Sequence, residues 1–398
     1  MTPELRYGPL DPGLWLDPYP LYARLRDEDP VHFVADRGFF VLSRFADVFA
    51  AATDTATFSS ASGLTFEEDE ITKLGLAPTL VMMDRPRHTD YRRLVNRMFT
   101  PRAVADLEPA VRAFARDRLE RIAEAGTADF VAELAGPLPS LVVASYLGVP
   151  ESDRTRFGHW SSAIVQANAS GSIFGAKEAL AELYGYFTDL LERRRAGPGA
   201  DMLSVLATST LDGRPVTVEE VLGFCFVMIA GGNDTASGLL SGMAAALTAD
   251  RDERALLLDD PGLVPGAVEE LLRYLTPVQG LSRTTTRAVT LHGTTVDAGT
   301  KVHLLYGSAN RDEREFGPDA AELRVRRRAP RMLAFSSGPH HCLGAAAARL
   351  QGRVVLEELL RAMPEFSADP AGGTYAPGPF TRRFDSLPIE AGPRKGAT

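Results

Sequence analysis

The sequence predicts a mainly α-helical fold with a small β region, built as a single large domain over residues 1–398. Apolar residues recur at spacings of three and four through most of the chain, which is the period of an amphipathic helix. Strand signals are short and few, and most of them lie near residues 282–306. No repeat, low-complexity linker or long charge run marks a domain boundary. With 45% hydrophobic residues, a chain of this length can bury one large core.

Helices account for the longest periodic stretches. The spacing predicts helices over residues 18–29, 90–99, 103–126, 176–197, 218–232, 264–275 and 344–363. Strands are expected where β-branched and aromatic residues lie between Gly and Asp turns, namely at 31–34, 39–43, 282–286, 289–293, 294–299 and 301–306.

The composition argues against several classes of protein. A net charge of −9 and a pI near 5.4 do not favour binding to nucleic acid or to an anionic membrane. The longest apolar run, at 221–230, is half the length of a membrane span, and the first twenty residues lack the basic and apolar regions of a secretory signal. We therefore expect a cytoplasmic protein.

Two histidines stand beside one of the two cysteines of the chain in the segment AFSSGPHHCLGAA, residues 334–346. A zinc site is disfavoured because no second cysteine or spaced histidine pair lies nearby. A nucleophilic thiol remains open, because the start of a helix just after Cys342 would lower the pKa of the thiol. A packed, unreactive cysteine is the commoner alternative at such a position.

The residues around this cysteine favour a fourth interpretation. The pattern Phe335-x-x-Gly338-x-His340-x-Cys342-x-Gly344 resembles the haem-ligand loop of the cytochrome P450 superfamily. The resemblance implies a haem b cofactor whose iron is bound by the Cys342 thiolate. It also implies that His340 donates a hydrogen bond to a haem propionate.

The glycines of the loop have separate roles under this resemblance. Gly338 would permit the turn that directs the thiolate at a flat cofactor, and Gly344 would let the next helix approach without a side-chain clash. Amide N–H groups at the start of that helix would donate to the sulfur and tune the iron. Ser336 stands where the family usually has Gly, which leaves the fine geometry of the loop open.

A second motif, Ala230-Gly231-Gly232-Asn233-Asp234-Thr235, interrupts an apolar helix. Glycine inside a helix costs roughly 1 kcal/mol relative to alanine, so its backbone is expected to lie close to another group. From the residues alone, a helix that ends at the glycines, with a new N-cap at Asn233 or Asp234, is equally acceptable. The P450 resemblance implies instead that Ala230 and Gly231 contact the haem. Thr235 would then hydrogen-bond the oxygen bound there, and Asp234 would relay protons.

Two charged residues in the helix expected at 264–275 are predicted to pair. Glu270 and Arg273 lie three residues apart on one helix face, a spacing that is also common on solvated helices. Their place between the glycine motif and the cysteine loop matches the structural Glu-x-x-Arg pair of P450 proteins. Residues 318–328 place Glu-Leu where the family has Arg-Phe, which leaves Asn310 and Arg311 as candidates for a third partner.

A buried haem needs several cationic donors for its two propionates. His88 and Arg92 share a helix face at a spacing of four and match the His-x-x-x-Arg pair that P450 proteins use for this purpose. Arg283 matches the strand arginine of the family and, with His340, completes four donors. Taken singly, each is more often a surface charge, and only their shared order along the chain favours the site.

An apolar substrate pocket is expected on the Thr235 side of the haem. Its candidates are apolar residues before the glycine motif, before the strand arginine and in the C-terminal turn, namely Phe224, Val227, Val278, Leu281 and Phe380. Ordinary core packing is the alternative for each of them. The reaction expected is the O₂-dependent hydroxylation, or a related oxidation, of a small to medium apolar molecule.

Electrons for such a reaction must come from another protein, because the chain has no flavin fingerprint and no Gly-rich nucleotide loop. We expect a ferredoxin, supplied by a ferredoxin reductase, to dock on a local basic patch on the cysteine side of the haem. The candidates for that patch are Arg92, Arg93, Arg97, Arg349 and Arg353.

The resemblance extends from residues 16–32 to the helix after Cys342. The segments VQGLSRTTTR, LLYGSANRDER and HHCLGAAAAR are similar to the mycobacterial cytochrome P450 family 130. A haem-thiolate monooxygenase is the function that these patterns favour. The alternative is a haem-binding sensor or carrier without turnover, because fold and ligand do not prove activity.

Overall fold

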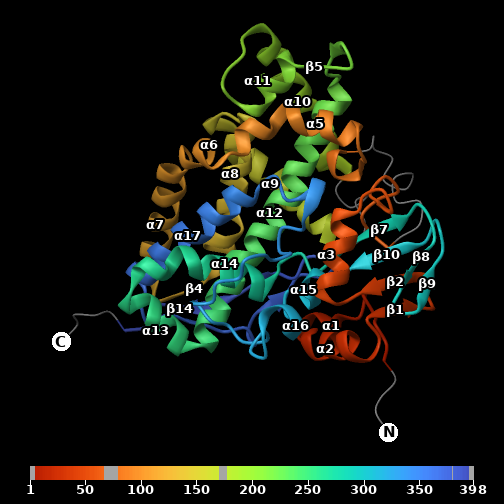
Figure 1. Cartoon of the computed structure of the whole chain (residues 1–398). Coiled ribbons are helices and arrows are strands. Elements are labelled where there is room, and N and C mark those ends of the chain that lie inside the picture. The colour runs from red at the N-terminus through yellow and green to blue at the C-terminus, as the bar shows by residue number, and fades with distance from the viewer. Residues whose placement is uncertain (1–4, 67–78, 170–176, 379, 394–398) are drawn as a thin grey trace.

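Helices form most of the molecule, and one long helix, α12 (Val218–Ala249), runs through its centre (Figure 1). The computed structural model describes residues 5–66, 79–169, 177–378 and 380–393. Strands β1, β2, β7 and β10 gather on one side of α12, and helices α7, α14 and α17 lie on the other (Figure 1). The mainly helical fold with small sheets is therefore confirmed.

Each stretch for which a helix was predicted contains an α-helix, although Asn96–Phe99 at the end of one stretch is the 3-10 turn η2. The α-helices are α1 (Pro12–Leu16), α2 (Tyr19–Glu28), α3 (Phe45–Thr53), α5 (Arg87–Val95), α6 (Pro101–Ala105), α7 (Glu108–Ala125), α8 (Pro137–Leu147), α9 (Arg154–Ala169), α10 (Lys177–Ala196), α11 (Met202–Thr208), α12, α13 (Arg251–Asp259), α14 (Val264–Leu275), α15 (Tyr306–Ala309), α16 (Glu313–Phe316) and α17 (Ala345–Ala362). Shorter helical turns are η1 (Leu80–Met82), η2 (Asn96–Phe99), η3 (Val131–Ala135), η4 (Glu151–Asp153), η6 (Pro261–Leu263) and η7 (Gly338–His340).

The helix predicted over 103–126 is divided into α6 and α7. Pro109 is the second residue of α7, where its missing N–H is tolerated. The same residue could not continue a helix from α6, because it has no hydrogen to donate to the preceding turn. The apolar spacing runs through both helices, which is why the sequence pattern did not reveal the break.

The helix that enters the glycine motif does not end there. It begins at a capping box, in which Thr217 and Glu220 bond each other's backbone N–H groups, and continues through both glycines to Ala249. A Cβ at Gly232 would lie only 2.8 Å from Val143 Cγ2, so α8 packs directly on the α12 backbone at this point. The alternative of a break with an N-cap at Asn233 or Asp234 is therefore wrong, because close packing maintains the helix.

The main sheet has five strands in the order β1 (Val31–Val34), β2 (Phe39–Leu42), β10 (Lys301–Leu304), β7 (Leu281–Thr285) and β3 (Phe58–Ser59). Strands β2 and β10 are parallel, and the other neighbours are antiparallel. A hairpin of β8 (Val289–Leu291) and β9 (Thr294–Val296) follows β7. Every predicted strand is thus paired, and the register places Arg283 opposite Val302.

Several very short strands had no signal in the sequence. One three-stranded sheet consists of β4 (Thr127–Asp129), β14 (Pro388–Glu390) and β11 (Ser367–Ala368), with β14 in the middle. Two further sheets have two strands each: β5 (Thr210–Leu211) with β6 (Arg214–Pro215), and β12 (Thr374–Tyr375) with β13 (Phe384–Ser386). Strands of two or three residues are too short to show a period of two.

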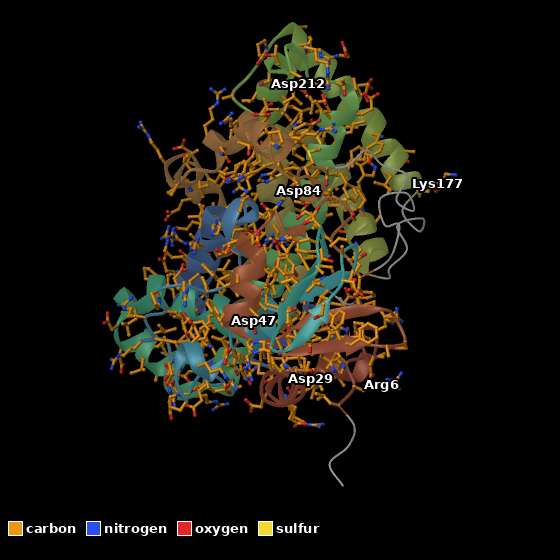
Figure 2. All side chains as sticks on the ribbon, turned by 45° about the vertical axis from the view of Figure 1, so that its right-hand side comes forward. Arg6, Asp29, Asp47, Asp84, Lys177 and Asp212 are labelled. Atoms are coloured by element: carbon orange, nitrogen blue, oxygen red, sulfur yellow. The ribbon has the colours of Figure 1, made fainter. Side chains whose placement is uncertain are left out.

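The β5–β6 turn and the N-terminal segment lie at opposite ends of the molecule (Figure 2). Asp212, in the turn between β5 and β6, lies at one end, and Asp29 and Arg6 lie at the other (Figure 2). Within the residues that the structure describes, no helix combines the length and the apolar character needed to cross a membrane.

Candidate haem site

The thiol expected to bind a cofactor lies in the short loop between η7 and α17. The amide of Cys342 donates to the carbonyl of Phe335 at 2.9 Å, which closes the loop. The Cys342 side chain is exposed, yet enough protein surrounds the sulfur for desolvation to raise its pKa. The backbone of Gly344 and the charges of Arg92 and Arg349 act against that rise and lower the pKa. The loop thus presents one accessible thiol with three groups that stabilise its thiolate.

Two residues of this loop have φ in the left-handed region. Gly338 has φ +68°, and a Cβ there would lie 3.0 Å from Thr53 Cα, so the end of α3 supports the loop. Ser336 has φ +55°, a conformation that costs a non-glycine residue roughly 1–2 kcal/mol. Its hydroxyl oxygen lies 3.2 Å from Tyr306 Oη. Ser336 therefore adopts the backbone conformation that glycine adopts most readily. The turn is formed even though serine replaces the glycine that the family usually has at this position.

The four predicted donors gather beside the loop. The rings of His88 and His340 have centroids 4.3 Å apart. Arg92 donates to the carbonyls of Pro339 and His341 at 2.9 and 2.7 Å, which ties α5 to the cysteine loop. Arg283 is buried in β7, and its charge lowers the pKa of His340. Residues far apart in the sequence thus form one cluster of cationic and imidazole groups.

Within the described part of the chain, no carboxylate forms an ion pair with this cluster. His88 Nε2, His340 Nε2 and Arg283 Nε are buried without a hydrogen-bond partner, and among the described residues none of the four donors is ion-paired with a carboxylate. Burial, followed by the charges of Arg283, His88 and Arg92, lowers the pKa of His340 to about 3. Arg283 is a buried cation, which is costly unless an anion neutralises it. A haem with two propionates fits this donor set.

The glycine motif of α12 leaves space for a flat group. A Cβ added at Gly231 would meet nothing within 4 Å, although neighbouring Gly232 is tightly packed. Gly231 is exposed, and Ala230 before it is half-buried. The Thr235 hydroxyl donates to the Gly231 carbonyl at 2.7 Å. This turn of α12 therefore has an open side, with one hydroxyl held against its backbone.

Asp234 has a partner that the sequence did not indicate. Its Oδ1 lies 2.7 Å from Arg383 Nε, and both side chains are almost fully buried. Arg383 also contacts Asp385, with Nη1 and Oδ1 2.9 Å apart. Because Arg383 is on the segment that enters β13, no local spacing in the sequence could have revealed the pair.

Two of the predicted substrate-contacting residues lie on α12 before the glycines. Phe224 is buried and stacks on Tyr91 of α5 with ring centroids 5.9 Å apart, as an ordinary core residue would. Val227, nearly one turn further along, is half-buried. Phe224 is therefore packed in the protein core, whereas Val227 is partly accessible.

The other three candidates lie near the main sheet and the C-terminal turn. Val278 forms an isolated bridge with Thr381, and Leu281 begins β7. Phe380 packs against Phe66, with ring centroids 5.5 Å apart. The structure thus brings the C-terminal turn beside Phe66, a residue that the sequence pattern did not single out.

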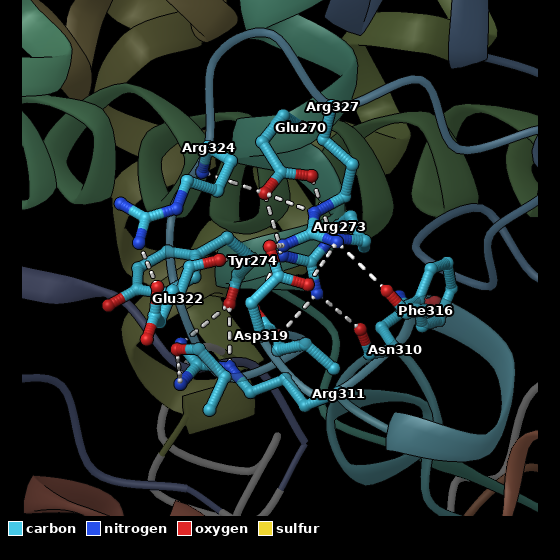
Figure 3. A network of polar contacts seen from close by, with 12 residues as sticks. Glu270, Arg273, Tyr274, Asn310, Arg311, Phe316, Asp319, Glu322, Arg324 and Arg327 are labelled. Atoms are coloured by element: carbon cyan, nitrogen blue, oxygen red, sulfur yellow. Dashed lines mark hydrogen bonds and ion pairs between the residues drawn. The ribbon is translucent and has the colours of Figure 1, made fainter.

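The predicted pair on α14 is fully buried. Arg273 binds Glu270 through two contacts of 2.7 Å, and both side chains have essentially no exposure. The remaining Arg273 hydrogens go to the carbonyls of Asn310, Ala320 and Glu322 (Figure 3). Every donor of the guanidinium is thereby directed at an oxygen, so the pair fixes the chain between α15 and the cysteine loop.

The third partner of this pair is Arg327. Its Nε lies 3.1 Å from Glu270 Oε1, and its other nitrogens bind Asp319 and the Phe316 carbonyl (Figure 3). The two candidates named from the sequence have other partners. Asn310 offers Arg273 only its backbone, and its side chain binds Thr276 and the amide of Leu333, while Arg311 binds the carbonyl of Tyr274. The run Arg326-Arg327-Arg328 could have suggested an arginine here, but not which one.

The expected basic patch is largely neutralised by ion pairs. Arg349 binds Glu269 at 2.6 Å, and Arg353 pairs with Glu108 and Glu357. Arg92 is directed into the loop, and Arg93 lies 3.3 Å from Asp90. Arg97 on η2 is exposed. The prediction of a patch with Arg349 and Arg353 as free charges is therefore not supported by their contacts.

Comparisons with known proteins agree with this architecture. A family model described as cytochrome P450 matches residues 259–374. The chain is 51% identical to cytochrome P450 130 of Mycobacterium tuberculosis, over 94% of this chain and 95% of that protein. It is 37% identical to the vitamin D(3) 25-hydroxylase of Pseudonocardia autotrophica, over 96% and 95% of the two chains.

A solved structure is similar over the same length. The cytochrome P450 CYP109Q5 from Chondromyces apiculatus superposes with a TM-score of 0.87 at 32% identity, covering 97% of this chain and 98% of that one. Similarity of this extent spans the cysteine loop, the glycine motif and the buried pair alike. The chain belongs to the cytochrome P450 family and is a cytochrome P450 monooxygenase, which implies a haem cofactor.

Proposed function

We propose that Cys342 would supply the thiolate that binds the iron of haem b and that His88, Arg92, Arg283 and His340 would bind its propionates. The observation that carries this assignment is the set of buried donor atoms without an anion beside an accessible thiol. Ala230 and Gly231 would contact one face of the haem, and Phe335, Gly338 and Gly344 the other. When bound, the haem supplies the activation of O₂ and the transfer of one oxygen atom to substrate.

Thr235 and Asp234 are assigned to proton handling. The Thr235 hydroxyl proton is held by the Gly231 carbonyl, so the lone pairs of Oγ1 are free to accept a hydrogen bond from water on the open side of α12. Asp234 is the neighbouring carboxyl group, and its Oδ1 lies 2.7 Å from Arg383 Nε. We infer that the Asp234 carboxylate leaves Arg383, takes up a proton from water and passes it on towards Thr235, which makes this ion pair a control point for proton transfer.

The substrate is a small to medium apolar molecule. Val278, Leu281 and Phe380 place apolar surface between β7 and the C-terminal turn, and Phe66 extends that surface. A relative at 37% identity is named for the hydroxylation of vitamin D(3), which is an apolar molecule. We propose hydroxylation of a molecule of comparable character.

A ferredoxin, reduced by its reductase, is the proposed electron donor. Among the arginines expected to dock it, Arg97 is exposed and Arg93 is mostly solvated, so these two supply the positive charge. Arg97→Glu should slow reduction by an acidic ferredoxin several-fold at low salt, and this difference should vanish at high salt. Arg353→Glu should have a smaller effect, because Arg353 is already neutralised by Glu108 and Glu357.

Turnover under ¹⁸O₂ tests the assignment as a whole. Haem-loaded protein, ferredoxin, reductase and NADPH are incubated with apolar compounds that displace water from the ferric iron, and products are analysed by mass spectrometry. One ¹⁸O atom per product is expected, with the yield per electron reduced in Thr235→Ala. Haem binding without labelled product from any such compound would favour the alternative of a sensor or carrier.

A further inference from the structure

A cavity of about 610 Å³ lies between α12 and helices α8 and α9. None of its lining residues belongs to the cysteine loop or to the four propionate donors. Asn233, Asp234 and Ser237 line it from α12, and Ser140, Ser161 and Arg154 line it from α8 and α9. Its volume falls within the range of small-molecule pockets.

Two buried polar groups in the wall of this cavity have an atom without a partner. Ser161 is 2% exposed, and its hydroxyl makes no hydrogen bond. Asn233 is 6% exposed, and its Nδ2 donates to the Ile229 carbonyl at 2.9 Å while its Oδ1 has no partner. Leaving a buried polar atom unpaired costs roughly 1–3 kcal/mol. A molecule in the cavity that pairs with these atoms removes this cost.

One charged side chain of the cavity wall has no acidic partner among the described residues. The two carboxylates that line the cavity, Asp234 and Asp385, are both engaged by Arg383. Arg154 also lines it, its Nε is buried without a hydrogen-bond partner, and no carboxylate in the described part of the chain is ion-paired with it. One guanidinium is therefore left to pair with a negative group from outside the protein.

Another part of the wall is apolar. It is formed by the side chains of Phe114, Val131, Pro137, Leu141 and Ala144. Three exposed residues of α9 also line the cavity, namely Thr155, His159 and Ser162. Because they are exposed, solvent reaches the cavity along α9. An occupant thus meets charge and hydroxyl groups on α9 and hydrocarbon on α8 and η3.

We propose that this cavity is a binding site for a small amphipathic carboxylate, separate from the haem. The carboxylate pairs with Arg154 and accepts a hydrogen bond from Ser161. The hydrocarbon body covers Phe114, Val131 and Leu141. Because Asn233 and Asp234 belong to the same turn of α12 as Thr235, an occupant contacts that turn. The ion pair of Asp234 and Arg383 forms part of the cavity wall.

Calorimetric titration of haem-loaded ferric protein with decanoate tests this proposal. The protein is first saturated with 4-phenylimidazole, which binds the iron and fills the space above it, and the shift of the Soret band reports on that step separately. Decanoate is expected to bind with one site per chain. Decyltrimethylammonium, which has the same hydrocarbon and the opposite charge, is expected to bind at least tenfold more weakly.

Matched variants locate the site. Arg154→Gln should weaken decanoate binding about tenfold or more, since it removes a charged hydrogen-bond partner. Arg156→Gln is the control, because Arg156 lies over Trp160 and near Glu182 and does not line the cavity. Ser161→Val is a second test, because it removes the Ser161 hydroxyl and keeps the charge of Arg154. This variant should also bind decanoate more weakly than wild type. No binding of decanoate, binding that 4-phenylimidazole abolishes, or equal affinity in Arg154→Gln and wild type would overturn the proposal.

Discussion

Asp234 and Arg383 form a buried ion pair, with Oδ1 and Nε 2.7 Å apart, that ties the centre of α12 to the start of β13. Removing one partner of such a pair leaves an uncompensated buried charge, which typically costs about 3–5 kcal/mol. The residue assigned to proton relay is therefore also a structural tether between α12 and the C-terminal strands.

We expect Arg383→Gln to lower the free energy of unfolding by about 3 kcal/mol. Asp234→Asn in the same chain should recover part of that loss, because the double variant buries no unpaired charge. Urea unfolding of the two single variants and the double variant measures the coupling. Strictly additive losses would contradict the ion pair.

Arg327→Gln should destabilise the chain by about 1–3 kcal/mol and reduce haem retention, because it removes one of the two guanidinium groups that donate to Oε1 of buried Glu270. Arg326→Gln is the matched control, since Arg326 is the exposed neighbour on the same segment. Thermal unfolding and the ratio of Soret to protein absorbance measure both effects. If the two variants have the same unfolding temperature and the same ratio of Soret to protein absorbance, Arg327 does not stabilise Glu270.

Gly232→Ala should be destabilising by about 1–3 kcal/mol, although alanine is the better helix former. The added Cβ would lie 2.8 Å from Val143 Cγ2. Val143→Ala in the same chain should relieve the clash, so that the pair of substitutions costs less than their sum. If Gly232→Ala instead raises the unfolding temperature, α8 does not pack on this turn as described.

His303 should make the protein sensitive to acid. Burial lowers the pKa of its imidazole to about 3, whereas the unfolded chain has the ordinary value near 6.5. The unfolded state therefore binds this proton more readily, and stability falls as the pH drops below about 6.5. Between pH 7 and pH 5 the loss from this group is about 2 kcal/mol.

Substituting His303 separates its contribution from that of other groups. Asn keeps a polar atom near the position of Nδ1, which lies 3.0 Å from Ser282 Oγ. His303→Asn should lose about 2 kcal/mol less than wild type between pH 7 and pH 5 in urea unfolding. An unchanged slope in His303→Asn would contradict a neutral buried imidazole.

Much of the fold was predictable where an element has one apolar face. Helix α14 begins and ends at the predicted residues, because its buried and exposed faces alternate with the helical period. Helix α8 gave no such signal, since apolar residues surround most of it and leave no polar face to mark a period. The shortest strands depend on tertiary pairing and carry no pattern of their own.

The site was predictable to the extent that its residues follow one another in a motif. Glu270 and Arg273 pair as their spacing suggested. Their third partner, Arg327, and the partner of Asp234, Arg383, come from distant segments, and only the folded chain brings them together. No local spacing identifies contacts of that kind.

The thiolate ligand is the central claim, and the absorption spectrum of the reduced, CO-bound protein tests it most directly. Wild type and Cys225→Ser should both show the red-shifted Soret band of a thiolate-bound haem, because Cys225 is buried in the core of α12. Cys342→Ser should lose that band while the protein remains folded. Two results would contradict the account. One is a Soret band of wild type at the position of histidine-ligated haem, and the other is a Cys342→Ser variant that keeps the red-shifted band of wild type.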